Sequence, residues 1–135
     1  MNYLMVFLGG GIGAMFRYGF SKWFNYLFGN IFVSLIHHSF PTGTFIVNIT
    51  GCLVIGILSG IASHISLDEN LRLFLFIGLL GGYTTFSSFG FESVNLFKYG
   101  AYGAAFIYIL ASNVIGLFLA FIGFYASHHI LAKLT

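Results

Sequence analysis

Long apolar runs separated by short polar connections dominate the chain. A helix that crosses a bilayer needs about 20 mostly apolar residues, and four segments meet this requirement. Asp68, Glu69 and Arg72 mark the connection before the third segment, and Lys98 lies at the start of the connection that follows it. We therefore predict an all-α membrane protein, a single four-helix transmembrane domain over 1–135. Its predicted spans are about 2–28, 43–63, 73–97 and 101–125.

The third predicted span contains residues that disfavour a regular helix. Gly81 and Gly82 are followed by hydroxyl residues that are interrupted only by Phe86, namely Thr84, Thr85, Ser87 and Ser88. An unpaired backbone group in hydrocarbon costs several kcal/mol. An opened backbone is therefore tolerated only where it faces protein, an ion or a water-filled path. The pattern predicts a broken third helix beside a permeation pathway.

Small residues recur at four-residue spacing, which lets helix backbones approach closely in lipid. Four short helices enclose a pathway poorly, so we expect a homo-oligomer. The pairs are Gly9 with Gly13, Gly56 with Gly60, Gly78 with Gly82, and Gly116 with Ala120.

Composition supports lipid as the main solvent. The chain is 59% hydrophobic and 6% charged, with a mean hydropathy of +0.97, whereas soluble domains carry about 25% charged residues. The net charge of +2 is too small and too scattered for a nucleic-acid-binding patch. We expect membrane lipid as a partner and no nucleic acid.

The basic residues give almost no bias in orientation. Four spans place Lys22 and Lys98, with Arg17 if it reaches the interface, on one side, and Arg72 and Lys133 on the other. Such a chain can insert both ways, which permits an antiparallel dimer. One orientation set by a few of these residues is the alternative.

Polar side chains form stripes on the second and fourth spans. Thr44 and Asn48 are four residues apart, as are Tyr108 and Ser112, so each pair shares a helix face. Asn48 offers two N–H donors. Both stripes can line a pathway, or they can form hydrogen bonds between helices.

Phe86 and Phe89 share a face of the third span, and Thr85 lies on the same face as Phe89. The edge of an aromatic ring carries the positive end of its quadrupole. Weak partial charges of this kind let an anion bind and move on, whereas a full cation would hold it. Packing or lipid contact is the alternative reading of the two rings.

Glu92 is the acid that lies well inside an apolar stretch, so it is a functional candidate. It suits a proton-coupled transporter, or it pairs with a lysine near the interface. Arg17 can close an ion pair or line a vestibule. The pairs His37–His38 and His128–His129 lack the i, i+4 spacing of a metal site, and we expect them to be interfacial. No nucleophile–base set is present, so an enzyme is not expected.

Three segments carry a specific resemblance. They are 9–18 (GGGIGAMFRY), 41–51 (PTGTFIVNITG) and 78–89 (GLLGGYTTFSSF). In this order, with four spans and a matching length, they resemble the Fluc-type fluoride channels, or CrcB family, over essentially the whole chain.

The resemblance implies an antiparallel dual-topology homodimer with two anion pathways in the cell inner (plasma) membrane. Phe86 and Phe89 match the paired pore phenylalanines of the family, and Asn48 matches its pore asparagine. Gly81 and Thr84 match positions whose backbone carbonyls hold a structural sodium ion. The remaining expected pathway residues are Thr44, Thr85, Ser87, Ser88, Tyr108 and Ser112, with Arg17 and Glu92 at family positions of less settled role.

We therefore expect a passive channel that lets cytoplasmic fluoride leave the cell. A small proton-coupled multidrug exporter that uses Glu92 is one alternative. A structural subunit of a larger membrane complex is another.

Overall fold

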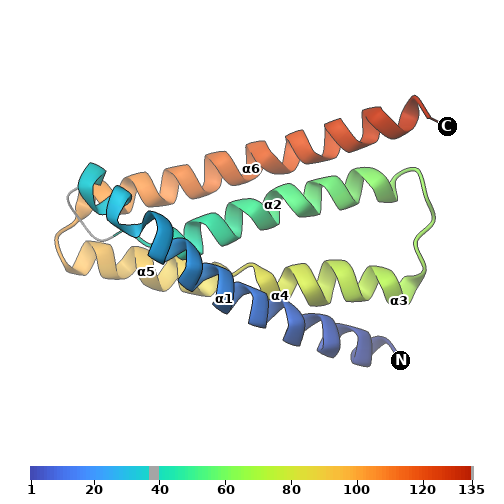
Figure 1. Ribbon diagram of the computed structural model, residues 1–135, viewed down its shortest axis with the longest axis horizontal. Coiled ribbons are helices and arrows are strands. Elements are labelled where there is room, and N and C mark those ends of the chain that lie inside the picture. Colours follow the sequence, from blue (N-terminus) through green and yellow to red (C-terminus); the bar gives the residue numbers. More distant parts are fainter. Residues whose placement is uncertain (37–39, 135) are drawn as a thin grey trace.

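The computed structural model describes residues 1–36 and 40–134, and all regular secondary structure in these two ranges is helical (Figure 1). Four helical segments in this part of the chain are long and apolar enough to cross a membrane, which confirms the predicted class of fold. Short helices α3 and α4, the π-helix η1 and helix α5 together form the third segment, Glu69–Lys98. The elements are α1 (Asn2–Ile36), α2 (Thr42–Ala62), α3 (Glu69–Arg72), η1 (Leu73–Leu80), α4 (Gly81–Tyr83), α5 (Phe86–Lys98) and α6 (Tyr102–Ala132).

Two helices extend further than the sequence predicted. Helix α6 continues to Ala132 instead of ending near residue 125, and the Ser127 hydroxyl in this extension donates to the carbonyl of Gly123 at 2.7 Å. Helix α1 continues to Ile36 instead of ending near residue 28. His37 and His38 lie outside the described residues.

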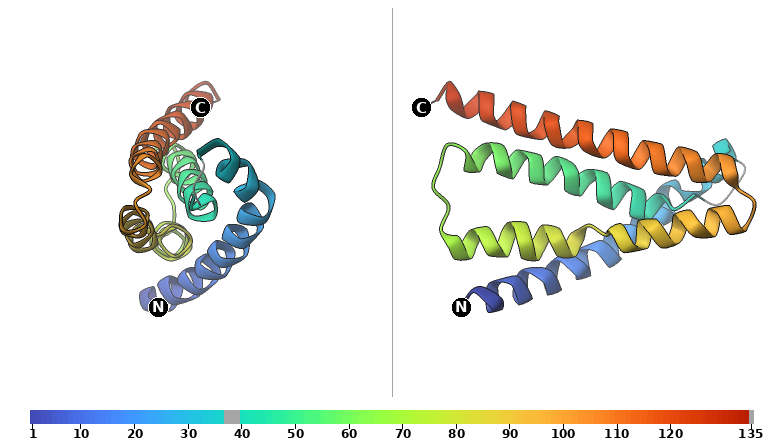
Figure 2. Two further views of the ribbon diagram at one scale, coloured as in Figure 1. Left: turned by 90° about the vertical axis from the view of Figure 1, so that its left-hand side faces the viewer. Right: turned by 180° about the vertical axis from the view of Figure 1, so that it is seen from behind.

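The helices form two closely packed pairs. Helix α2 lies parallel beside α6, and α1 crosses the third segment obliquely at η1 and α4, while the two termini lie at the same end (Figures 1 and 2). Glycines make both contacts possible. A Cβ added at Gly56 would overlap the carbonyl of Ala120, and one added at Gly13 would overlap the carbonyl of Leu79. The close approach predicted from small-residue spacing is confirmed at these positions.

Polar side chains bind backbone N–H groups at the N-terminal ends of α2 and α3. The Asn25 side-chain oxygen, from α1, accepts a hydrogen bond of 2.7 Å from the N–H of Gly43 in the first turn of α2. Asp68 caps α3 by accepting from the N–H of Asn70 at 2.9 Å. N–H groups in the first turn of a helix have no acceptor within the helix, and these bonds supply one.

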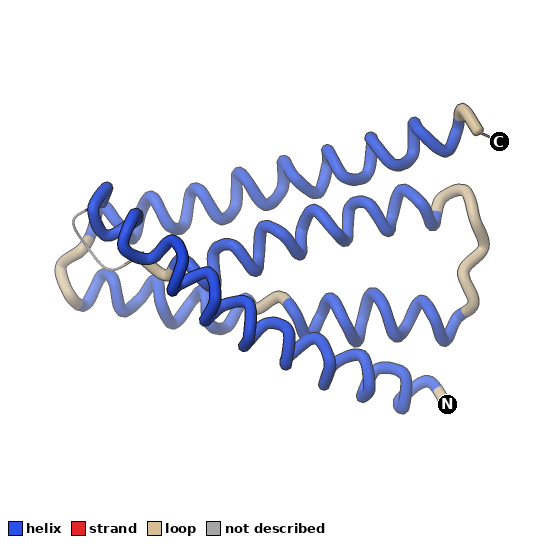
Figure 3. The backbone as a smooth tube through the Cα atoms, in the orientation of Figure 1, coloured by secondary structure: helices blue, strands red, loops and turns tan. Residues whose placement is uncertain are grey.

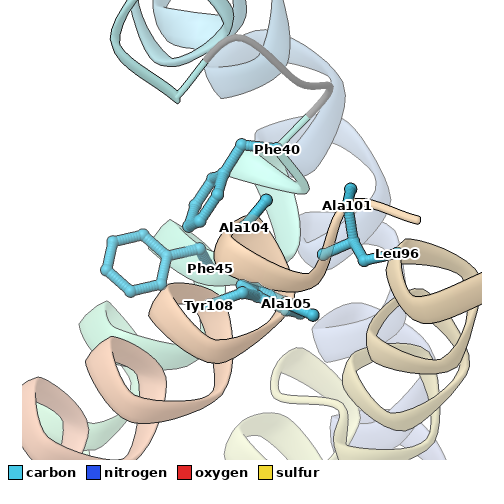
Figure 4. Close-up of a cluster of buried hydrophobic side chains, with 7 residues drawn as sticks. All are labelled: Phe40, Phe45, Leu96, Ala101, Ala104, Ala105 and Tyr108. Carbon is cyan, nitrogen blue, oxygen red and sulfur yellow. The ribbon is translucent and has the colours of Figure 1, made fainter. Parts of the chain in front are cut away.

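A small buried cluster joins α2, α5 and α6 near the α5–α6 connection (Figure 4). Tyr108 is fully buried in it, and its ring meets that of Phe40 edge-on at 5.3 Å. Most other large apolar side chains are exposed, as expected for a surface solvated by lipid. The cluster fixes one side of the candidate site. Its members are Phe40, Phe45, Leu96, Ala101, Ala104, Ala105 and Tyr108.

Candidate functional site

Two residues with extended backbone separate α4 from α5 (Figure 3). Thr84 has φ −83° and ψ 158°, and Thr85 has φ −149° and ψ 115°. They belong to the run of hydroxyl residues that the sequence singled out. The Thr84 N–H still donates to the carbonyl of Leu80 at 3.0 Å. The backbone groups of Thr85 need partners from outside the helix, because the third segment crosses an apolar environment here.

Asn48 of α2 supplies partners for Thr85. Its side-chain oxygen accepts a hydrogen bond of 2.8 Å from the N–H of Thr85, and its side-chain nitrogen donates one of 3.0 Å to the carbonyl of the same residue. The amide therefore holds the backbone of Thr85 at both ends. One of its two N–H groups is used in this way, and the residue also lines the adjacent cavity.

The Thr85 side chain caps the N-terminus of α5. Its hydroxyl oxygen accepts a hydrogen bond of 3.2 Å from the N–H of Ser88 and donates one of 3.0 Å to the Ser88 hydroxyl. The Ser87 hydroxyl lies 3.3 Å from the Thr85 hydroxyl. Three of the predicted pathway hydroxyls thus gather at the N-terminal end of a helix, where the helix dipole is positive.

A cavity of about 340 Å³ lies beside this segment. Its walls are mostly apolar, with a few polar groups from three helical segments. The Ser112 hydroxyl is buried and has no hydrogen-bond partner among the described residues. Six residues singled out by the sequence line the cavity together with Gly81, and they are Asn48, Thr84, Thr85, Phe86, Phe89 and Ser112.

The two phenylalanines lie next to each other, with ring centroids 5.6 Å apart and planes inclined by 40°. Phe86 is 82% exposed, whereas Phe89 is partly buried and contacts the ring of Tyr108 at 5.1 Å. The Phe86 ring is therefore free of packing on most of its surface, and the Phe89 ring is held by the buried cluster.

The Glu92 carboxylate accepts hydrogen bonds from two other predicted pathway residues. One carboxylate oxygen accepts a hydrogen bond of 2.7 Å from the Thr44 hydroxyl, and the other accepts one of 2.7 Å from the Tyr108 hydroxyl. Thr44 and Tyr108 therefore do not line the cavity that holds Ser112. Glu92 instead borders a second cavity of about 260 Å³, with Asn95 as its polar neighbour. Arg17 lines neither of these two cavities.

Some lining residues were not predicted. Ile55 lies seven residues after Asn48, on the same face of α2, so the helical period contained the signal for it. Phe76 and Leu80 come from the π-helix η1, where the change from i+4 to i+5 bonding shifts which residues share a face. The hydroxyls of Thr44 and Tyr108 bond Glu92, whereas Ser112 lines the cavity. Residue spacing does not predict this difference.

Comparison with known proteins identifies the family. A family model described as "CrcB-like protein, Camphor Resistance (CrcB)" matches residues 4–124. A protein of Desulfotalea psychrophila named fluoride-specific ion channel FluC is 40% identical over 133 residues, covering 98% of this chain and 97% of the relative. Proteins of the same name from Hydrogenobaculum sp. and Phocaeicola vulgatus are 44% and 40% identical, covering 91% and 92% of this chain and 94% and 96% of their own lengths. The chain, a multi-pass membrane protein by its four apolar helices, belongs to the CrcB family.

Proposed function

We propose that this protein is a passive, selective fluoride channel that exports cytoplasmic fluoride down its electrochemical gradient across the cell inner membrane. Relatives named fluoride-specific ion channels match more than nine-tenths of the chain at 40–44% identity. The observation that carries the proposal is the cavity beside Thr84 and Thr85, because two aromatic rings, an amide and a hydroxyl without a partner among the described residues line it together.

These groups suit a small anion that holds its water tightly. The Ser112 hydroxyl and the second N–H of Asn48 are neutral donors that can replace part of its hydration shell. Ring edges of Phe86 and Phe89 add weak positive potential. Because none of the described residues that line the cavity carries a full positive charge, an ion that enters can also leave.

The functional unit in this proposal is an antiparallel homodimer. The cavity is open at the surface of one chain, and Phe86, on its rim, is mostly exposed. A second copy of the chain packed over this surface would complete two pathways related by symmetry. The near balance of basic residues on the two sides supports insertion in both orientations.

A structural sodium ion at the break of the third span is a further part of the proposal. In a continuous helix the carbonyl of Gly81 would accept from the N–H of Thr85, and that of Thr84 from the N–H of Ser88. Here the first N–H donates to Asn48 and the second to the Thr85 hydroxyl. Both carbonyls are thereby released from those helical bonds, and carbonyl oxygens are ligands that suit a hard monovalent cation. Bound there, the cation would offset the cost of bringing an anion into a low-dielectric region.

A proton-coupled exporter would need the Glu92 carboxylate to exchange protons or bind a cationic substrate. Both of its oxygens instead accept short hydrogen bonds from Thr44 and Tyr108. We therefore assign Glu92 to positioning the two hydroxyls and the helices that carry them.

The test is efflux from liposomes that contain the purified protein, followed with a fluoride electrode and, in parallel, a chloride electrode. Fluoride loss that needs no pH gradient and is not matched by chloride is the expected result. Equal loss of both ions would remove the selectivity from the proposal, and efflux that requires a pH gradient would favour an exporter.

A further inference from the structure

Two histidines from different helical segments meet at the end of the α2–α6 pair. His64, just after α2, places its Nε2 atom 3.0 Å from Nδ1 of His128 in α6. The Ser63 hydroxyl oxygen lies 2.8 Å from the same Nδ1 atom. The sequence drew attention to the neighbouring pair of His128 and His129, but adjacent residues point to different sides of a helix. The meaningful partner of His128 is 64 residues away.

Three polar atoms converge here with too few protons to bond them all. The Ser63 hydroxyl donates to the carbonyl of Gly60 at 2.7 Å, which leaves its oxygen as an acceptor. Nδ1 of His128 has either one proton or one lone pair, yet it faces both Ser63 and His64. At least one of these contacts is therefore shared or left without a proton. A cation placed among them would use all three lone pairs.

The packing of α2 on α6 holds the His128 imidazole in place, and His64 lies in the turn directly after α2. The His128 ring stacks on that of Phe124, with centroids 5.6 Å apart and planes inclined by 9°. A Cβ added at Gly60 would overlap the Ser127 side chain and the carbonyl of Phe124, so α2 and α6 are in close backbone contact at this level. Ligands fixed by rigid elements lose little freedom when they bind an ion.

We infer that His64 and His128 form a binding site for a divalent transition-metal ion such as Zn²⁺ or Cu²⁺. Unprotonated imidazole nitrogens bind both ions. Two nitrogens 3.0 Å apart can both lie at the usual distance of about 2.0–2.1 Å from one ion, once the rings rotate so that their lone pairs point toward it. Ser63 and water would complete the coordination, since Ser63 is exposed and His64 is only partly buried. The inference is independent of fluoride conduction.

The test uses purified full-length protein without an affinity tag. The chain has five histidines, so a background variant H37N/H38N/H129N leaves His64 and His128 as its remaining histidines. Zn²⁺ is titrated by calorimetry into this background and into the same background with H64N or H128N added. We expect the background to bind one Zn²⁺ per chain, and each added substitution to weaken binding by at least about tenfold, since even indirect supports of a ligand contribute about 10–100-fold. Equal affinity before and after either substitution, or no binding by the background, would overturn the inference.

Electron paramagnetic resonance with Cu²⁺ gives a second readout that does not depend on affinity. The background should show hyperfine coupling to two imidazole nitrogens, and each single-histidine variant should show one. Size-exclusion chromatography and circular dichroism establish that each variant is folded. Zn²⁺ should also raise the thermal midpoint of the background and leave that of the H64N variant unchanged, because the ion binds only when both helices are in place. A signal from one nitrogen in the background would contradict a two-histidine site.

Discussion

The side chain of Asn48 forms hydrogen bonds with both the N–H and the carbonyl of Thr85. This pairing gives both backbone groups of Thr85 a partner while its backbone is extended within an apolar segment. It also draws the Thr85 N–H away from the carbonyl of Gly81. One amide thus links α2 to the segment from which the proposed pathway and sodium site are built.

Substitution of Asn48 by Ala should destabilise the protein and reduce fluoride flux. Two hydrogen bonds to partly buried backbone are lost, each worth about 1 kcal/mol, with a further cost because the Thr85 groups are left unsatisfied. Thermal unfolding in detergent and efflux from liposomes measure the two effects. The matched variant N48D keeps an acceptor for the Thr85 N–H but places a carboxylate oxygen against the Thr85 carbonyl, so it should be no more stable than N48A. A stable N48A protein with normal flux would contradict the role given to this residue.

Ser112→Ala should lower flux and leave stability unchanged or slightly higher. The hydroxyl is buried without a partner among the described residues, so its removal relieves a desolvation cost and takes one donor from the cavity. Unfolding and efflux are measured on the same preparation. A control is S127A on the same helix, whose hydroxyl bonds backbone carbonyls far from the cavity. Unchanged flux in S112A would remove Ser112 from the pathway.

Alanine at Phe86 or Phe89 should reduce fluoride flux by up to about tenfold, since an edge-on aromatic contact is worth about 0.5–1.5 kcal/mol. F86A should do so with little change in stability, because that ring is mostly exposed. F89A should also destabilise, because its ring packs against Tyr108. F118A on α6, an exposed phenylalanine that does not line the cavity, is the control for lipid-facing aromatics. Full flux in both F86A and F89A would refute their place in the pathway.

Replacement of Glu92 by Gln should change flux only modestly. Gln keeps the shape and one acceptor, so it weakens the bonds from Thr44 and Tyr108 without removing the side chain. The measurement compares E92Q and Y108F for fluoride efflux, since Y108F removes the hydrogen bond that E92Q weakens. Complete loss of flux in E92Q, with Y108F active, would point to an essential carboxylate and thus to a proton-coupled mechanism.

Close packing between α1 and the third segment should make one glycine intolerant of a methyl group. Gly13→Ala would push a Cβ into the carbonyl of Leu79, whereas Gly11→Ala meets nothing within 4 Å. Overpacking costs about 1–3 kcal/mol, and Ala in an open helical position gains up to about 1 kcal/mol over Gly. G13A should therefore unfold at a lower temperature than wild type, and G11A at an equal or higher one. The reverse order would mean that α1 does not pack in this way.

Apolar run length and small-residue spacing predicted the four spans and their close contacts, because both follow from local pattern and bilayer thickness. The sequence also singled out the segment around Thr84, Phe86 and Phe89 as a candidate site, since clusters of glycine and hydroxyl residues are rare in spanning helices. Residue spacing predicted which helix face carries Tyr108 but not the partner of its hydroxyl. That hydroxyl donates a hydrogen bond to Glu92 and does not face the cavity. The contact of His64 with His128 depends on the tertiary packing of α2 on α6, which no local pattern encodes.

The most direct test of passive conduction sets the membrane voltage of fluoride-loaded liposomes with a potassium gradient and valinomycin. A channel predicts that fluoride moves with the imposed voltage, even against its own concentration gradient, and stops at the level at which the two balance, whatever the pH difference. Fluoride movement that follows the pH difference and ignores the voltage, or no movement with folded protein, would contradict it.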